Sequence, residues 1–280
     1  MNIRSAISKA KYLLESKNIR SSGLDCELLM SKVLKKDRNY ILLNLDKNLK
    51  KKIFNSFQSL IRERSRGKPI AYLIEKKEFW DHEFKTNEGV LIPRPDTELI
   101  VEQVLNLTQN KSKLRILDIG TGSGCIILSI LKEKKNYKGI GIDISKKCID
   151  LCKINTSKLN LTNRVKFFKS DIDNFTDAKY DLILSNPPYI NKFDFKCLEK
   201  GIIEFESKSS LYGGIDGLSE IRKIINKSSE LIKINGKLIL EIAYDQKFNV
   251  QRLLKDRGFY VNKVFKDLAN NDRCIVSTKI

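Results

Sequence analysis

The stretch DIGTGSGC, residues 118–125, decides the fold of this 280-residue chain. It overlaps the end of the apolar run RILDIG (115–120) and opens a helical segment, IILSILKEK (126–134). Glycines at 120, 122 and 124 permit a tight turn and let a ligand approach the backbone, beside the positive end of a helix dipole. The stretch therefore predicts a binding loop for a ligand with an anionic or polar end. A dinucleotide fingerprint, G-x-G-x-x-G, would need glycine where this chain has Cys125.

From Leu114 onward, short apolar runs alternate with helical stretches. That alternation is typical of a parallel sheet with crossover helices. The runs predicted as strands are RILDIG (115–120), KGIGID (138–143), VKFFKS (165–170), YDLILS (180–185), KLILEI (237–242), FYVNKV (259–264) and CIVSTK (274–279). The segment between the last two has no helical pattern, which favours an antiparallel hairpin at the edge. The sequence thus predicts an α/β, Rossmann-like, seven-stranded domain.

Acidic residues follow two of these strands at positions suited to a nucleoside. Asp143 ends the second strand, 23 residues after Gly120, where a carboxylate can accept both hydroxyls of a ribose. Asp171 follows the third strand, near where an adenine amine would lie. Asp143 alone could also be a helix N-cap, a role that Ser145 can fill instead. Together with the loop, these acids favour a nucleoside cofactor, and the pattern looks like the S-adenosylmethionine loop of class I methyltransferases.

Directly after the fourth predicted strand stands Asn186-Pro187-Pro188-Tyr189. The prolines remove two N–H donors and stiffen the backbone, which leaves a surface rich in acceptors. The Asn186 side-chain oxygen and the Pro187 carbonyl can hold the two hydrogens of an –NH2 group, and Tyr189 can pack against its flat face. The tetrapeptide therefore predicts a reaction site for methyl transfer to a planar nitrogen, in which orientation and polarisation replace a strong base.

The first quarter of the chain has a different character. Apolar residues recur at helical spacing through residues 1–75, which predicts a small all-helical domain. Residues 76–95 alternate aromatic and apolar residues and predict a hairpin-like connector, and a helix is predicted from Asp96, with Asp96 or Thr97 as N-cap. We therefore expect a helical domain at 1–75, a connector at 76–95 and the sheet domain at 96–280.

The net charge of +19 leaves nucleic-acid binding open at this point. Of the 53 basic residues 40 are Lys and 13 are Arg, and Arg is the residue preferred for bidentate phosphate and base contacts. Residues 1–75 hold 17 Lys and Arg against 7 Asp and Glu, so the helical region carries more than half of the excess. The charge is thus equally consistent with a Lys-rich background.

Several classes of protein are excluded or disfavoured by composition. The six cysteines are scattered without a CxxC pair and His82 is the only histidine, which argues against zinc spacings, a disulfide scaffold and a catalytic histidine. We expect no metal. No apolar run approaches the roughly 20 residues of a membrane span, and charged residues interrupt the N-terminus where a secretory signal would be apolar. We expect a cytoplasmic protein with no membrane partner.

Further motifs carry a resemblance to a known family. EFWDHEFKTNEGVLIPRPDTELIVE (78–102), LDIGTGSGCI (117–126), SNPPYI (185–190), GGIDG (213–217) and LEIAYDQ (240–246) resemble the HemK/PrmC peptide chain release factor glutamine methyltransferases. The similarity runs from GLDCELLMSKVL (23–34) to NNDRCI (270–275). Two positions depart from the family pattern, Ala243 where glycine is common and Ser207 where proline is common.

The resemblance implies a class I S-adenosylmethionine-dependent enzyme that methylates the amide nitrogen of the glutamine in the Gly-Gly-Gln motif of class 1 release factors. It implies that Arg94, Pro95 and Glu98 form a lid near the cofactor or substrate, and a salt bridge within the loop is an equally open role for Arg94 and Glu98. It assigns the cofactor to Gly120, Thr121, Gly122, Ser123, Gly124, Asp143, Asp171, Ile172 and Asn186. It assigns the glutamine to Asn186, Pro187, Pro188 and Tyr189, with Asn186, Pro187 and Tyr189 as catalytic residues.

Two other functions stay open on the sequence. Asn-Pro-Pro-Tyr is shared with enzymes that methylate adenine-N6 in DNA, although the only extra module is a 75-residue helical region rather than one suited to reading base edges. A binding protein that keeps the cofactor loop without catalysis is the other. Under the family interpretation we expect no stable nucleic-acid partner, and because no coiled-coil heptads are present we expect a monomer.

Overall fold

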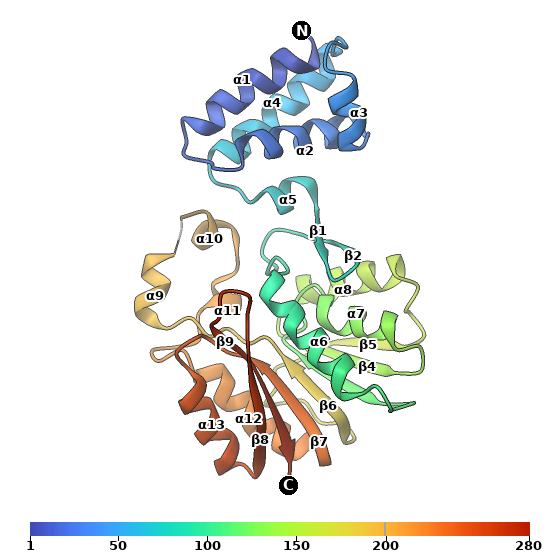
Figure 1. Ribbon diagram of the computed structural model, residues 1–280, viewed down its shortest axis with the longest axis vertical. Helices are drawn as coiled ribbons and strands as arrows, with labels where there is room; N and C mark the ends of the chain where they lie inside the picture. The colour runs from blue at the N-terminus through green and yellow to red at the C-terminus, as the bar shows by residue number, and fades with distance from the viewer. Residues whose placement is uncertain (199) are drawn as a thin grey trace. The chain divides into compact units, whose positions relative to one another are not determined.

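The structure is a computed structural model that describes residues 1–198 and 200–280. The described chain divides into two compact units, and each is considered by itself (Figure 1). The first contains residues 1–76 together with 200–205, and the second contains 77–198 and 206–280. Within the described residues, no helix combines the length and apolar character needed to cross a membrane.

The first unit is helical, as predicted. Its helices are α1 (Ile3–Glu15), α2 (Ser22–Leu34), α3 (Arg38–Leu43), α4 (Lys51–Ser65), α5 (Ile70–Ile74) and α10 (Lys200–Phe205). Ile3, Ala6, Ala10 and Leu14 recur every three or four residues and bury one stripe of α1. An ion pair joins the buried Asp25 of α2 to the partly buried Arg64 of α4, with Arg64 Nε 2.7 Å from Asp25 Oδ2. The apolar stripe and this pair fix the packing of the bundle.

The second unit is built on one seven-stranded sheet, which confirms the predicted fold class. Its strands are β3 (Arg115–Ile119), β4 (Lys138–Asp143), β5 (Val165–Lys169), β6 (Tyr180–Ser185), β7 (Ile232–Glu241), β8 (Phe259–Lys266) and β9 (Asp272–Lys279). Their order is β5-β4-β3-β6-β7-β9-β8, parallel as far as β7. Strand β9 pairs antiparallel with both β7 and β8, so the predicted hairpin is confirmed, with β8 at the edge.

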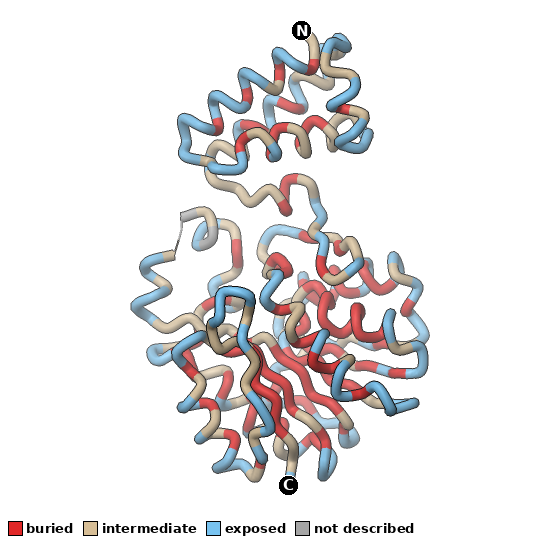
Figure 2. Tube along the Cα trace, in the orientation of Figure 1, coloured by how far each residue is buried: buried red, intermediate tan, exposed pale blue. Residues whose placement is uncertain are grey.

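The central strands of the sheet are buried (Figure 2), and the side chains that alternate along them enter two different apolar clusters. Ile116 and Ile239 belong to one apolar cluster, and Leu117 and Leu238 belong to the other. The first cluster includes helices α6 (Glu98–Leu107) and α7 (Cys125–Glu133), and the second includes α12 (Ser219–Leu231) and α13 (Lys247–Asp256). The remaining helices of this unit are α8 (Lys146–Lys158), α9 (Lys192–Cys197) and α11 (Lys208–Leu211).

The strand order creates a switch point beside β3. The chain passes from β3 outward to β4 and β5, and then returns to the other side of β3 as β6. In open α/β sheets, ligands bind outside the carboxyl ends of the strands at such a point. At that point the glycine loop follows β3, Asp143 ends β4, and Asn186 follows β6.

The segment before the sheet contains two short strands, β1 (Lys76–Phe79) and β2 (His82–Lys85), which pair with each other. A 3-10 turn, η1 (Pro95–Thr97), then leads into α6. The predicted helix is therefore present but begins at Glu98. Thr97 occupies its N-cap position without a side-chain capping bond, since its hydroxyl is used elsewhere.

Candidate active site

A cavity of about 360 Å³ lies at the switch point. Its volume is within the range of roughly 300–1,000 Å³ usual for small-molecule sites. Most of the predicted cofactor and substrate residues line it, namely Gly120, Thr121, Gly122, Ser123, Asp143, Asp171, Ile172, Asn186, Pro187 and Pro188. Segments far apart in sequence complete the wall, including Arg94 and Thr97 before the sheet and Lys223 on α12. The structure thus brings the separate sequence motifs to one place.

The glycine loop is held by the neighbouring strand. The amide N–H groups of Gly120 and Thr121 both donate to the carbonyl of Ile142, at 2.9 and 3.0 Å. Below the loop, the Thr121 hydroxyl donates to the buried Asp118 carboxylate at 2.7 Å. Burial raises the pKa of Asp118 to about 7, against the opposing effect of this hydrogen bond. The loop is therefore shaped before any ligand arrives.

Gly124 is a predicted cofactor residue that does not line the cavity. Its φ of 82° lies in the left-handed region, and an added Cβ would stand 3.0 Å from Leu128 Cδ1 and 3.2 Å from Cys152 Sγ. Glycine at this position is thus explained by close packing at the start of α7. Gly120, in contrast, is exposed to the cavity with nothing within 4 Å of an added Cβ.

Asp143 lies half-buried at the end of β4. Its Oδ2 accepts from the Gly122 amide at 3.0 Å, and its Oδ1 accepts from the Ser145 amide at 2.8 Å. Burial raises the pKa of Asp143, while these two backbone hydrogen bonds oppose the shift. The cap of α8 is Ser145, whose hydroxyl accepts from the Cys148 amide, so Asp143 is not needed as N-cap. The Cys148 side chain also hydrogen-bonds to the carboxylate, which leaves one of its roughly four lone-pair sites for a further donor.

The Asp171 and Ile172 pair follows β5. Asp171 is exposed, and its Oδ1 accepts from the Asp173 amide at 3.0 Å. Ile172 is buried and joins the apolar cluster beneath the sheet while one side lines the cavity. A polar atom and an apolar surface are thus available where the sequence places the adenine.

Asn186, Pro187 and Pro188 line the cavity directly after β6. Asn186 is half-buried, and its Nδ2 donates to Thr97 Oγ1 at 2.9 Å. Tyr189 is absent from the lining, and its hydroxyl donates to Glu241 Oε1 at 3.0 Å. The structure therefore presents three of the four predicted substrate residues to the cavity and turns the Tyr189 hydroxyl toward the end of β7.

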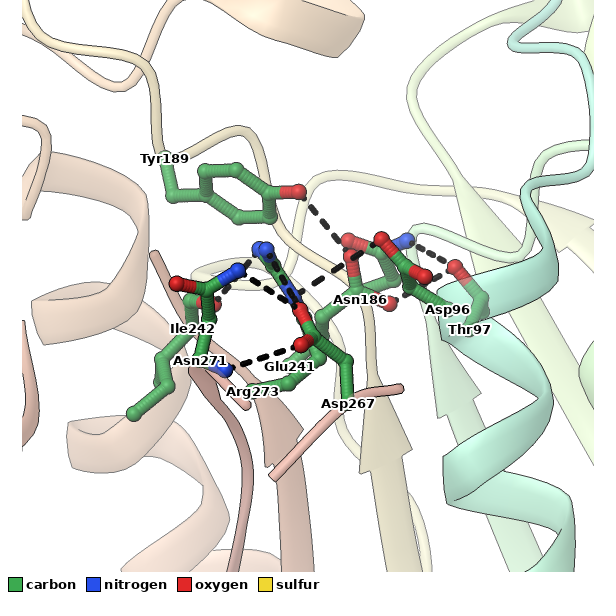
Figure 3. A network of polar contacts seen from close by, with 9 residues as sticks. All are labelled: Asp96, Thr97, Asn186, Tyr189, Glu241, Ile242, Asp267, Asn271 and Arg273. Atoms are coloured by element: carbon green, nitrogen blue, oxygen red, sulfur yellow. Dashed lines mark hydrogen bonds and ion pairs between the residues drawn. The ribbon is translucent and has the colours of Figure 1, made fainter. Parts of the chain in front are cut away.

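A polar network connects Asn186 and Tyr189 to residues before the sheet and at the ends of β7 and β9 (Figure 3). Glu241 is 1% exposed, and its Oε2 accepts from the Thr97 hydroxyl at 2.6 Å. Arg273 stands beside it, bound to Asp267 at 3.1 Å and to the Ile242 carbonyl at 3.2 Å. Burial raises the pKa of Glu241, and the Thr97 and Tyr189 hydroxyls and the Arg273 cation oppose that shift.

The main chain of the tetrapeptide is held separately. Gln246, at the N-cap position of α13, donates from Nε2 to the carbonyls of Tyr189 and Gly217, each at 3.1 Å. Its Oε1 accepts from the Ala243 amide at 3.0 Å. Gln246 is buried with these partners, so it fixes the loop after Pro188 to the turn after β7.

The three residues of the implied lid have different positions. Arg94 lines the cavity and forms an ion pair with the buried Glu206, with Nη2 2.5 Å from Oε1. Burial raises the pKa of Glu206, and the Arg94 guanidinium opposes that shift. Glu98 accepts from the Trp80 amide at 2.8 Å and does not line the cavity. Pro95 is exposed and opens the 3-10 turn.

Sequence reasoning missed the roles of Thr97, Glu241, Gln246 and Asp118. Glu241 and Gln246 both lie in LEIAYDQ, a stretch that supported the family resemblance but received no role. Thr97 was assigned only to helix capping. Glu241 could have been found from its position, because it is a polar residue at the carboxyl end of a buried strand. The carboxyl ends of parallel strands lie along one edge of the sheet, where the ligand binds.

Known proteins resemble this chain along its whole length. A family model described as the PrmC N-terminal domain matches residues 5–74, and one described as a methyltransferase domain matches 110–275. A release factor glutamine methyltransferase of Buchnera aphidicola subsp. Acyrthosiphon pisum is 38% identical over 279 residues, covering 100% of this chain and 99% of its own. A protein of that name from Clostridium acetobutylicum is 35% identical, with the same coverage.

Among solved structures, a methyltransferase from Pyrococcus furiosus is similar in fold, with a TM-score of 0.54 at 16% identity. The similarity covers 79% of this chain and 97% of that one, and at this identity it concerns the fold alone. The two family models and the full-length relatives together establish that this chain belongs to the release factor glutamine methyltransferase family.

Proposed function

We propose that this protein transfers a methyl group from S-adenosylmethionine to the side-chain amide nitrogen of the glutamine in the Gly-Gly-Gln motif of class 1 release factors. The proposal is carried by the position of Asn186. It lines the same cavity as the glycine loop, and its side-chain amide is held by Thr97. Family membership supports the choice of a glutamine as the methyl acceptor.

The cavity fits the cofactor in chemistry and size. Asp143 would accept from the ribose hydroxyls at its remaining lone pair, Asp171 would accept from the adenine amine, and Ile172 would cover one side of the base. The exposed backbone at Gly120 would allow close approach of the rest of the molecule. When bound, S-adenosylmethionine supplies a methyl group on a positively charged sulfur, which is an electrophile that needs no further activation.

The residues after β6 would hold the glutamine. An amide nitrogen is a weak nucleophile because its lone pair is delocalised into the carbonyl. The Asn186 Oδ1 and the Pro187 carbonyl can each accept one of its two hydrogens, which aims the nitrogen and draws charge toward it. Tyr189 anchors the same loop, because its side chain packs against the apolar cluster on one side of the sheet and its hydroxyl donates to Glu241. No strong base is required before attack.

The substrate is tested directly by methyl incorporation. We expect the protein to transfer label from S-adenosylmethionine to a purified release factor and not to the same release factor with Gln→Ala in its Gly-Gly-Gln loop. Duplex DNA serves as the second acceptor, because adenine methylation is the alternative function. Equal labelling of the Gln→Ala release factor, or protease-resistant label in DNA, would contradict the proposal.

We propose further that residues 1–75 bind the protein substrate, with 76–95 as connector and 96–280 as the transferase region. The basic excess of residues 1–75 supports docking on an acidic surface. Charge reversal at the exposed Lys50, Lys51 and Lys52 is expected to raise the release-factor KM several-fold and to weaken its salt dependence. Matched reversals at the exposed Lys132, Lys135 and Lys138 are the control. An unchanged salt dependence after the first set would show that docking does not use this charge.

A further inference from the structure

The side-chain amide of Asn186 could adopt two orientations that differ by half a turn, and the residue type alone does not determine which one is present. A side-chain amide has an oxygen that accepts and a nitrogen that donates, and the two ends have nearly the same shape. Only the oxygen can receive an N–H of a substrate amide. If the amide were rotated by half a turn, Asn186 would present N–H groups to the cavity. Something must therefore select one of the two orientations.

The contacts behind Asn186 make that selection. Thr97 Oγ1 is 2.6 Å from Glu241 Oε2 and 2.9 Å from Asn186 Nδ2. A hydroxyl has one hydrogen, and an ionised carboxylate can only accept. The Thr97 hydrogen is thus committed to Glu241, which leaves Thr97 Oγ1 as an acceptor facing Asn186. Only the Nδ2 end of Asn186 satisfies that acceptor, so Oδ1 is the end left for the cavity.

The Glu241 carboxylate is itself held against rotation. Its other oxygen, Oε1, accepts from the Tyr189 hydroxyl at 3.0 Å, and Arg273 stands beside it (Figure 3). Glu241 is 1% exposed and Thr97 is 3% exposed, so water does not compete for these bonds. Three residues from separate segments therefore act on the orientation of one amide: Thr97 of η1, Glu241 of β7 and Tyr189 in the loop after β6.

We infer that the buried Thr97–Glu241 pair is a positioning device that fixes Asn186 with its oxygen toward the substrate, and that it thereby makes the site select a glutamine amide over a glutamate carboxylate. A glutamate carboxylate in place of the glutamine amide would put an acceptor oxygen against the Asn186 oxygen. Neither atom could then donate a hydrogen bond, which is unfavourable. This inference rests on the proposed function, because it concerns the acceptor of the same reaction.

The test compares variants that keep shape but change the direction of the hydrogen bonds. Thr97→Val removes the hydroxyl and frees the Asn186 amide to rotate. We expect kcat toward the release factor to fall about ten- to a hundredfold, with cofactor affinity unchanged, because misorientation affects the reacting geometry. Thr97→Ser keeps the hydroxyl and restores most of the loss. Thr108→Val, which removes a buried hydroxyl bonded to the Val104 carbonyl of the same helix, is the matched control and is expected to keep wild-type kcat.

A second readout separates orientation from general damage. Release factors carrying Gln→Glu and Gln→Ala in the Gly-Gly-Gln loop are used as competing inhibitors. For the wild type, we expect the Gln→Glu protein to bind no better than the Gln→Ala protein. For Thr97→Val, the Gln→Glu protein should gain several-fold over the Gln→Ala protein, because Asn186 can then offer its N–H groups. Glu241→Gln, which has nearly the same shape but brings a donor, should give the same gain if Thr97→Val does not fold.

The outcomes separate the two proposals. A wild-type protein that does not methylate the release factor contradicts the proposed function. If the wild type methylates the release factor and Thr97→Val has the same kcat, the positioning role is contradicted. It is also contradicted if a folded variant keeps the wild-type ranking of the two inhibitors. A lower kcat that Thr97→Ser does not restore also contradicts it, since loss would then follow from packing.

Discussion

Replacing Asn186 with alanine is expected to lower kcat by at least about a hundredfold, while the cofactor Kd changes little. The loss follows from the removal of the oxygen that would accept a substrate N–H, since a single preorganised hydrogen-bond partner at the reacting group is worth roughly a hundred- to a thousandfold in rate. The cofactor should bind nearly as before, because the glycine loop and Asp143 are held by contacts that do not involve Asn186.

The measurement pairs single-turnover methylation of a release factor with cofactor binding by calorimetry. Asn226→Ala, at an exposed position on α12, is the matched control and should retain both values. If Asn186→Ala keeps wild-type turnover, the reaction site is not at the end of β6. If it loses cofactor binding in the same proportion as turnover, Asn186 acts through the cofactor and not through the glutamine.

Replacing Asp143 with asparagine is expected to raise the cofactor Kd about ten- to a hundredfold, because a hydrogen bond to a charged group contributes about 1.5–3 kcal/mol. Both carboxylate oxygens already accept backbone N–H groups, from Gly122 and Ser145. An asparagine has one oxygen, so its –NH2 end would face one of those donors and the loop would have to shift. At saturating cofactor, kcat should recover most of its value.

Calorimetry with S-adenosylmethionine, or with its demethylated product, measures this effect. Asp150→Asn, at an exposed position on α8, changes charge equally without facing the cavity and should bind as the wild type does. An unchanged Kd for Asp143→Asn would mean that the ribose is held elsewhere. A lower kcat at saturating cofactor with an unchanged Kd would show that Asp143 acts in the methyl-transfer step and not in cofactor binding.

The fold was predictable because its central strands, β3 and β6 among them, are buried and appear as short apolar runs between segments of helical periodicity. The edge strands β5 and β8 are largely exposed and follow from their β-branched and aromatic residues. The positions of Gly120, Asp143 and Asn186 were predictable for a related reason. Each ends or directly follows a parallel strand, and those strand ends meet at one edge of the sheet.

The side-chain pairings were not predictable from local pattern. Thr97 lies at the start of a helix, as its residue type suggests, but its hydroxyl binds Glu241, 144 positions away in the chain. Arg94 pairs with Glu206 over a separation of 112. Such partners are chosen by the packing of η1 and the strand ends, which no periodicity encodes. Gly124 does not line the cavity, and a glycine required by packing against Leu128 and Cys152 is indistinguishable in sequence from one required by a cofactor.

Tandem mass spectrometry of the methylated release factor shows directly whether the methyl group goes to one glutamine nitrogen. We expect a single added methyl group on the side-chain amide of the Gly-Gly-Gln glutamine, formed by the wild type and by Thr108→Val and lost with Asn186→Ala. A methyl group on any other residue of the release factor, or a release factor that stays unmodified while DNA is methylated, would contradict it.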